Sequence, residues 1–284
     1  MIGYGSLVVY LTPKGRKHIK KLEEGQDWHN SLGTLKASAV AEASYGDVLL
    51  TNLGSPVRIL NATLEDRLMG LKRQTQIIYP KDIAYICLRL GAGPGVTIAE
   101  AGCGSGGLTV ALSWFAGPAG KIISQDSREE FVRLAARNLA WAGVGGNVEL
   151  HCQDLDSGFV AANTDALFLD VREPWRYLDK AAAALQPGGV AGFLIPTVNQ
   201  AQELLLGLEK GPFIEIEMCE ILIRHWKTIP DRLRPRDRMT AHTSFLLFCR
   251  KAAKSEAFDL AMPLGTRERK QQAAKEAREA GESE

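Results

Sequence analysis

A glycine-rich segment near the middle of the chain has the residue types of a ligand-binding turn. It follows the apolar run Val96–Ala99, precedes a second apolar run, and reads Glu100, Ala101, Gly102, Cys103, Gly104, Ser105, Gly106, Gly107. Glycines allow a ligand to approach the backbone closely, and a helix that begins there offers free N–H donors. Gly102, Gly104 and Gly107 also fit the dinucleotide pattern G-x-G-x-x-G, which is a weak signal by itself. The order of strand, glycines and helix favours a nucleotide-like cofactor over a tight turn without a ligand.

Polar residues end the next two predicted strands. Asp126 ends the first, where its carboxylate could accept hydrogen bonds from both hydroxyls of a ribose, and Ser127 lies beside it. An alternative for Asp126 is an N-cap of the helix that starts near Arg128. The second strand ends at Gln153 and Asp154, whose polar groups could meet the exocyclic amine of an adenine. Because the carboxyl ends of parallel strands meet at one edge of a sheet, we expect these groups and the glycines to form one cofactor site.

Such a site needs a parallel sheet flanked by helices, and from residue 79 onward the sequence predicts alternating strands and helices. Strands are predicted at 96–100, 121–126, 148–152, 166–170 and 190–195, with helices at 108–115, 128–141, 175–185 and 198–209. Residues 214–223 and 244–249 are predicted to pair as a final antiparallel hairpin. The predicted fold class is therefore α/β, a doubly wound, Rossmann-like sheet of seven strands with an antiparallel edge.

Residues 1–75 are predicted to form a small N-terminal β-rich domain. Short apolar pieces at 6–11, 48–51 and 57–60 are separated by glycine and proline, and helical periodicity first appears at Leu64. Residues 28–30, with Gly33, are predicted to be a loop between strands. Residues 76–253 form the predicted main domain, and 254–284 a charged C-terminal tail that is a solvated helix or disordered.

Composition excludes several classes of protein. The 284 residues carry 34 Lys and Arg against 33 Asp and Glu, a formal net charge of +1. This balance excludes a generally basic protein of the histone or ribosomal kind but permits a local basic face. No apolar run approaches the roughly 20 residues of a membrane helix. The five cysteines include no CxxC pair, so the sequence predicts neither a disulfide framework nor a metal site, and favours a reducing cytoplasm.

Several motifs together resemble a known enzyme family. The order Glu100, Gly102, Gly104, Gly106, followed by Asp126 and Asp154, is similar to the class I S-adenosylmethionine-dependent methyltransferases. In that class the acid before the first glycine helps to hold the methionine part of the cofactor, whereas a dehydrogenase has no special need for it. Four further stretches are QIIYPKD at 76–82, DVREPW at 170–175, PTVNQ at 196–200 and RPRDRMTAHTSFL at 234–246. With the glycine motif they resemble the tRNA (adenine-58-N1)-methyltransferase family of bacteria and archaea, and the likeness runs to about Lys251.

The resemblance implies a class I methyltransferase catalytic domain at residues 76–253. It also implies a homotetramer that transfers a methyl group from S-adenosylmethionine to N1 of an adenine in the T-loop of tRNA. The base would enter a pocket near Asp170, whose carboxylate could accept a hydrogen bond from N6, orient the base and stabilise its developing positive charge. Tyr79 matches a family tyrosine that could stack on the flipped adenine. The plainer alternatives are a polar strand-end residue for Asp170 and a packing residue for Tyr79.

Basic residues supply candidate contacts to tRNA phosphates. Arg234, Arg236 and Arg238 lie within a family motif and are the predicted tRNA-binding residues, with His242 as a residue of the base pocket. A second basic cluster lies at residues 14–21. Runs of charge are often only solvated surface, and a hydrogen-bonded structural histidine is an equal alternative for His242.

The sequence departs from the family pattern at three places. The family often has Leu-Pro after its acid, where this chain has Val171 and Arg172, and Leu194 stands in place of a second tyrosine. Cys103 replaces a small residue and is predicted to pack as a buried thiol. Three rival functions are a class I methyltransferase with another substrate, a non-catalytic tRNA-binding relative and a dinucleotide oxidoreductase. The intact glycines and the aspartates at 126 and 170 argue against the non-catalytic role.

Overall fold

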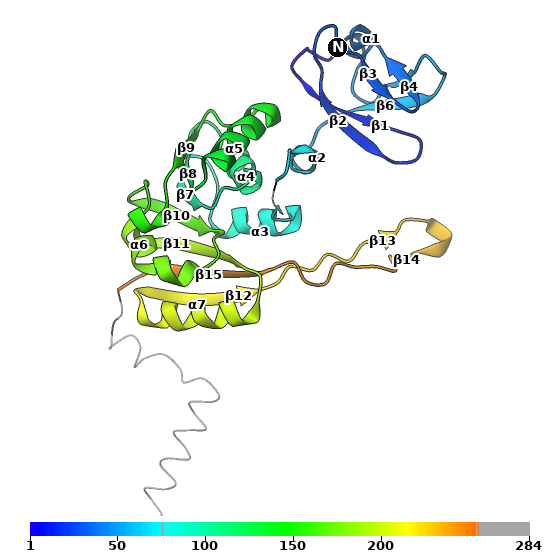
Figure 1. Cartoon of the computed structure of the whole chain (residues 1–284). Coiled ribbons are helices and arrows are strands. Elements are labelled where there is room, and N and C mark those ends of the chain that lie inside the picture. Colours follow the sequence, from blue (N-terminus) through cyan, green and yellow to red (C-terminus); the bar gives the residue numbers. More distant parts are fainter. Residues whose placement is uncertain (75–76, 254, 256–284) are drawn as a thin grey trace, which may run out of the picture.

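The computed structural model describes residues 1–74, 77–253 and 255, and its largest part is a seven-stranded sheet (Figure 1). The strand order is β12-β15-β11-β10-β7-β8-β9. The bounds are β7 Thr97–Ala101, β8 Lys121–Asp126, β9 Val148–Cys152, β10 Thr164–Leu169, β11 Leu185–Ile195, β12 Phe213–Cys219 and β15 Phe245–Lys251. Strands β7 to β11 run parallel, whereas β15 is antiparallel to both β11 and β12. The predicted sheet and its antiparallel hairpin are thereby confirmed.

Helices cover both faces of this sheet. Alternate residues of a strand point to opposite faces, so Ile98 and Phe168 pack with α3 Pro80–Arg89, α4 Gly107–Ala116 and α5 Glu129–Ala142. Ala99 and Leu167 pack on the other face with α6 Leu178–Ala184 and α7 Val198–Lys210. Because both faces are buried, the central strands read as continuous apolar runs rather than alternating ones.

Two segments of the main sheet differ from their predicted bounds by more than two residues. The strand predicted at 214–223 ends at Cys219, because the chain then leaves the sheet as an arm, residues 220–243 (Figure 1). The arm contains the short pair β13 Trp226–Lys227 and β14 Arg234–Pro235, joined through the 3-10 helix η3 Pro230–Arg232. Strand β11 begins at Leu185 and so includes the Pro187–Gly189 segment, which was predicted to separate helix from strand. The pairing of β10 with β11 has a register irregularity between Thr164 and Ala166, which accommodates the added Pro187–Gly189 segment.

The N-terminal part contains a four-stranded antiparallel sheet in the order β2-β1-β6-β5. Its strands are β1 Leu7–Leu11, β2 Lys17–Lys21, β5 Val48–Leu50 and β6 Pro56–Asn61. The loop predicted at 28–30 is wrong, because β3 Trp28–Asn30 pairs with β4 Gly33–Leu35 and buries Trp28 against Tyr10. Helix α1, Ala37–Glu42, lies in the region before Leu64 where the sequence shows no helical periodicity. With buried apolar positions only at Ala37 and Val40, this helix is too short to reveal its period.

Helix α2, Leu64–Gly70, connects the N-terminal sheet to the main sheet. Asp66 in its first turn forms an ion pair with Lys17 of β2 at 2.7 Å. Beyond the helix, Lys72 exchanges two backbone hydrogen bonds with the Asn138 side chain on α5. The predicted tail at 254–284 lies outside the described residues, apart from Ser255. Within the described part of the chain, no helix has the length and apolar character needed to cross a membrane.

Candidate functional site

The glycine turn between β7 and α4 is shaped by close backbone approaches. Gly102 has φ +87°, and a Cβ built there would lie 2.1 Å from the carbonyl oxygen of Asp170. Gly106, with φ +77°, would bring a Cβ within 3.0 Å of Ala135 on α5. Gly107 is different, because its nearest contacts would be at 4.0 Å. The first glycine therefore lets the turn lie against the end of β10, and the turn leaves the N-terminus of α4 directed at the carboxyl edge of the sheet.

Asp126, at the end of β8, holds this turn in place. One carboxylate oxygen accepts a hydrogen bond from the Gly104 N–H at 3.1 Å, and the other accepts one from the Arg128 N–H at 3.0 Å. The residue is 6% exposed. The N-cap of α5 is Arg128 itself, without a side-chain cap, so the predicted alternative role of Asp126 as N-cap is not seen. Asp126 instead connects two strand ends.

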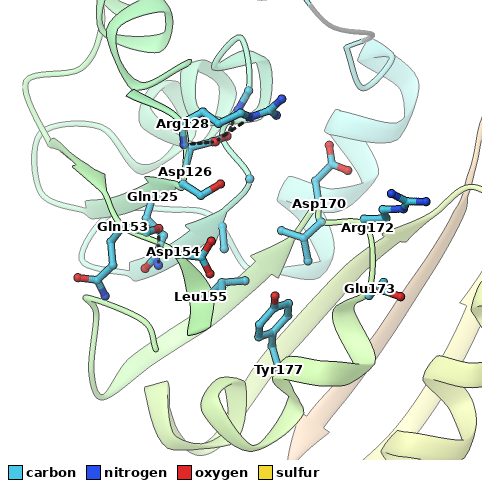
Figure 2. Close-up of a pocket in the computed structure, with 15 residues that line it drawn as sticks. Gln125, Asp126, Arg128, Gln153, Asp154, Leu155, Asp170, Arg172, Glu173 and Tyr177 are labelled. Atoms are coloured by element: carbon cyan, nitrogen blue, oxygen red, sulfur yellow. Dashed lines mark hydrogen bonds and ion pairs between the residues drawn. The ribbon is translucent and has the colours of Figure 1, made fainter. Parts of the chain in front are cut away.

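A cavity of about 480 Å³ lies over the ends of these strands (Figure 2). It brings together six residues that were predicted for the cofactor: Gly102, Gly104, Asp126, Ser127, Asp154 and Asp170. Asp154 also begins the 3-10 helix η1, Leu155–Ser157, by accepting the Asp156 N–H at 2.7 Å. The side chains come from β8, from the loop after β9 and from the loop after β10, which is the predicted convergence at one edge.

The remaining predicted cofactor residues lie deeper. Glu100 is 2% exposed, and one of its carboxylate oxygens accepts hydrogen bonds from the hydroxyls of Thr109 and Ser124, both at 2.6 Å. Burial raises the pKa of Glu100 to about 7 despite those bonds, with further contributions from Asp170 and Asp126. Glu100 shares a small cavity with six other predicted residues: Gly102, Cys103, Gly104, Ser105, Gly107 and Asp170.

Two of those deep residues support the turn. The Ser105 carbonyl accepts a hydrogen bond from Asn138 on α5 at 2.7 Å, and its hydroxyl accepts one from the Gln74 N–H at 3.4 Å. Cys103 is buried, and burial raises the pKa of its thiol. This is the predicted packing role for Cys103.

A second cavity, of about 270 Å³, lies beside the first. Its lining comprises Ile77, Ile78, Tyr79, Asp82, Asp170, Leu194, Pro196, Thr243 and Ser244. Asp170 lines both cavities, and burial together with the nearby charge of Asp126 raises the pKa of its carboxyl to about 6. Tyr79 stands on the opposite segment as the N-cap residue of α3 and is 43% exposed. The structure thus brings together the two residues predicted to be catalytic.

The arginines predicted to bind tRNA lie apart from both cavities, on the arm. Arg234, Arg236 and Arg238 are exposed, and Arg234 forms an ion pair with Asp237 at 3.0 Å. His242 donates to Glu220 at 2.5 Å and to the Pro196 carbonyl oxygen at 3.0 Å. The bond to Glu220, followed by the one to Pro196, raises the pKa of the imidazole. His242 therefore joins the base of the arm to the end of β11, as in its structural alternative.

Several cavity residues were not predicted as site residues. Tyr177 lines the first cavity from the 3-10 helix η2, Pro174–Tyr177, a segment predicted as part of a longer helix. Gln125 precedes Asp126 on β8, and its side chain binds the Gly158 carbonyl oxygen at 3.1 Å and the Val160 N–H at 3.0 Å. Its position before a predicted acid was the available signal. Nothing in the sequence indicated Tyr177 as a site residue, because a 3-10 turn produces no periodic pattern of apolar residues.

Known proteins similar to this chain include tRNA methyltransferases. A curated relative from Thermus thermophilus, named tRNA (adenine(58)-N(1))-methyltransferase TrmI, is 34% identical over 239 residues, which cover 84% of this chain and 94% of that protein. The solved structure of TrmI from Aquifex aeolicus, titled a tRNA (m1A58) methyltransferase, superposes with TM-score 0.78 and 37% identity, covering 89% of this chain and 99% of that one.

A further solved structure is titled a SAM-dependent O-methyltransferase from Thermotoga maritima. It superposes with TM-score 0.85 and 38% identity, covering 90% of this chain and 96% of that one. The family model described as the tRNA methyltransferase complex GCD14 subunit matches residues 56–243, which include the glycine turn, Asp126, Asp170 and the whole arm. Since that match spans more than half of the 284 residues, the chain belongs to the GCD14 family of tRNA methyltransferase subunits.

Proposed function

We propose that this protein transfers a methyl group from S-adenosylmethionine to N1 of an adenine in the T-loop of tRNA, at position 58 or a neighbour. The observation that carries the proposal is the place of Asp170, which lines both the larger cavity and the adjoining one that contains Tyr79. A methyl transfer needs two adjoining binding sites, one for the methyl donor and one for the acceptor, and Asp170 borders both. The names of the Thermus and Aquifex relatives support tRNA as the second substrate.

The larger cavity has suitable groups for S-adenosylmethionine. The N-terminus of α4 offers backbone donors to the carboxylate of the methionine part, and the glycines at 102 and 104 let the ligand approach the turn closely. Asp126 faces the cavity and can accept hydrogen bonds from the ribose hydroxyls, and Asp154 can accept one from the adenine amine. Ser127 and Tyr177 complete its wall. Glu100 is buried beneath the larger cavity and would fix the end of β7 through the hydrogen bonds that it accepts from the hydroxyls of Thr109 and Ser124.

The second cavity can hold the target adenine. When bound, the cofactor supplies an electrophilic methyl group, and the N1 lone pair forms the new bond as the sulfur–carbon bond breaks. The Asp170 carboxylate accepts a hydrogen bond from N6 and stabilises the positive charge that develops on the ring. The Tyr79 ring covers one face of the base. Leu194 lines the same cavity with an aliphatic side chain.

We further propose that the arm and the N-terminal sheet contact tRNA, and that the active assembly is a cytoplasmic homotetramer. Arg236 and Arg238 on the arm, with the basic residues at 14–21, would bind phosphates. The arm also exposes large apolar side chains, which a neighbouring copy would cover: Leu222, Ile223, Trp226, Ile229, Leu233 and Met239. The domain boundaries near residues 75 and 253 remain a prediction.

The deciding experiment incubates the protein with unmodified tRNA and methyl-labelled S-adenosylmethionine, then maps the modified base. Label at N1 of a T-loop adenine is the expected result. Label on free adenosine or a protein substrate, with none on tRNA, would replace the proposal with a class I methyltransferase of another substrate. Calorimetry without detectable S-adenosylmethionine binding would support the non-catalytic relative, and NAD binding would support the oxidoreductase.

A further inference from the structure

A buried ion pair and a hydroxyl join two distant segments of the chain beside the second cavity. The Lys81 ammonium donates to both carboxylate oxygens of Asp82, at 2.7 and 2.9 Å, and to the Thr243 hydroxyl at 2.7 Å. That hydroxyl in turn donates to Asp82 at 3.0 Å. Lys81 and Asp82 belong to the first turn of α3, whereas Thr243 ends the arm just before β15. We call these three residues the clasp.

The clasp lies where the two walls of the second cavity meet. Asp82 and Thr243 both line this cavity, from the wall that carries Tyr79 and from the wall at the entrance to β15. The Asp82 side chain is 1% exposed and that of Lys81 only 10%. The Tyr79 carbonyl oxygen accepts hydrogen bonds from the Asp82 and Ile83 N–H groups, both at 2.9 Å. The place of Tyr79 relative to Asp170 therefore depends on where the first turn of α3 is held.

Stability alone does not explain a buried charge pair at this place. Removing two charges from water has a large desolvation cost, and well-packed apolar residues often replace such pairs without loss of stability. A directional network does fix one arrangement of the groups that it joins. Each contact of the Lys81 ammonium is directional, and one of them reaches across to the second wall.

We propose that the clasp is a positioning device for the methyl transfer, which sets the spacing between the Tyr79 wall and the Thr243 wall so that the target adenine lies in line with the methyl group. The inference rests on the proposed function, and it assigns to Lys81, Asp82 and Thr243 a role that involves no direct contact with the reacting atoms. Small displacements of a substrate from the reactive geometry lower turnover strongly, whereas cofactor binding in the larger cavity does not depend on this spacing.

Three threonine variants test the clasp. Thr243→Val removes the hydroxyl but keeps the Lys81–Asp82 pair, and Thr243→Ser restores a hydroxyl. Thr164→Val is the matched control, because the Thr164 hydroxyl also donates a hydrogen bond, to the Ala184 carbonyl oxygen at 3.1 Å, and Thr164 is buried at the opposite end of β10 from Asp170. Each variant is assayed for kcat and KM with tRNA, for cofactor affinity, for Tm, and for amide hydrogen exchange at Asp82 and Ile83.

We expect Thr243→Val to lower kcat/KM for tRNA by about 3- to 10-fold, mainly through kcat, while cofactor affinity stays within about twofold. Thr243→Ser should restore the rate, and Thr164→Val should lower Tm without changing the rate. Thr243→Val should also accelerate amide exchange at Asp82 and Ile83, whereas the control should not. A Thr243→Val protein that matches Thr164→Val in rate and exchange overturns the inference. If the wild-type protein does not methylate tRNA, the proposed function fails, and the exchange data still decide whether the clasp holds the first turn of α3.

Discussion

At the scale of single residues, Asp170 has three structural roles, one through its backbone and two through its side chain. Its backbone carbonyl lies against Gly102, its side chain lines the cofactor cavity, and the same side chain lines the cavity with Tyr79. Burial and the charge of Asp126 raise the pKa of its carboxyl to about 6. A carboxylate that ionises only above that pH can stabilise positive charge on a base strongly, because little water screens it.

Asp170→Asn preserves the shape of this side chain and removes its charge. We expect kcat for tRNA methylation to fall by about 100-fold or more, with cofactor affinity changed by less than about tenfold. In the wild-type protein kcat/KM should also fall as the pH is lowered through about 6, because protonation removes the hydrogen-bond-accepting charge. The measurement is a pH profile of kcat/KM for both proteins. An asparagine variant with wild-type turnover, or with the same acidic limb, would contradict this assignment.

At the scale of elements, the site is built from a turn that joins β7 to α4 and a network beneath it. The turn needs a positive φ at Gly102 and no side chain, since the end of β10 is in contact with it. Glu100, one strand position away from that turn, connects β7 to β8 and α4 through the hydroxyls of Ser124 and Thr109. The turn requires that Gly102 has no side chain, whereas the network requires the carboxyl group of Glu100.

Gly102→Ala should destabilise the protein by about 3 kcal/mol or more, because the new Cβ would overlap the Asp170 carbonyl oxygen and the φ of +87° is itself unfavourable. Gly188→Ala is the matched control, since Gly188 has φ +81° with nothing within 4 Å of a Cβ. Its cost should be about 1–2 kcal/mol, from the backbone conformation alone. Denaturant unfolding of both variants measures the difference. Equal losses would mean that the close approach to β10 is not restrictive.

Glu100→Gln should change how stability depends on pH. The pKa of Glu100 is raised from 4.5 to about 7 in the folded protein, so the folded state binds more protons than the unfolded state in that interval. The stability contributed by this group is therefore present at low pH and is lost as pH rises from 4.5 to 7, by an amount of the order of 3 kcal/mol. The glutamine variant should lack this loss.

Denaturant unfolding at several pH values across that interval measures the effect. Glu24→Gln, at an exposed position, is the control for the removal of one carboxylate. Parallel pH profiles for the wild-type and Glu100→Gln proteins would show that the buried carboxyl does not titrate as described.

At the scale of the whole molecule, charge is distributed unevenly. The net charge of +1 is a sum over the whole sequence, whereas the arm holds Arg224, Lys227, Arg232, Arg234, Arg236 and Arg238 against Glu220, Asp231 and Asp237. The arm extends away from the main sheet (Figure 1), so these arginines can reach a substrate much larger than the cavities. A mean charge near zero is compatible with a strong local attraction to phosphates.

Replacing both Arg236 and Arg238 by Gln should weaken tRNA binding and reduce the slope of log K against log salt concentration by about 2 units, one for each phosphate contact. Arg176→Gln is the control, because Arg176 is an exposed arginine of the main domain that is paired with Glu173 at 3.3 Å. A salt titration of tRNA binding separates the variants. An unchanged slope in the double variant would remove the arm from the tRNA interface.

Local pattern in the sequence determined most of the fold. Strand bounds at 121–126 and 148–152 agree with the structure residue for residue, because each strand follows a glycine-containing turn and is followed by polar residues. The glycine turn and the acids at 126 and 154 were placed at one edge because the carboxyl ends of parallel strands meet there. Short or irregular elements escaped prediction, as α1 and the 3-10 turn with Tyr177 show, because they contain too few residues to display a period.

Only the tertiary structure decided the contacts between distant segments. The clasp joins residues 162 positions apart in the sequence, and the second cavity needs four separate segments to close it. The sequence also named His242, and only the structure shows that it bonds to Glu220 and to Pro196, at the base of the arm and the end of β11. Sequence pattern records the backbone direction and the burial of each element, whereas the packing of elements fixes which side chains meet, and in this protein it is packing that places Asp170 between two cavities.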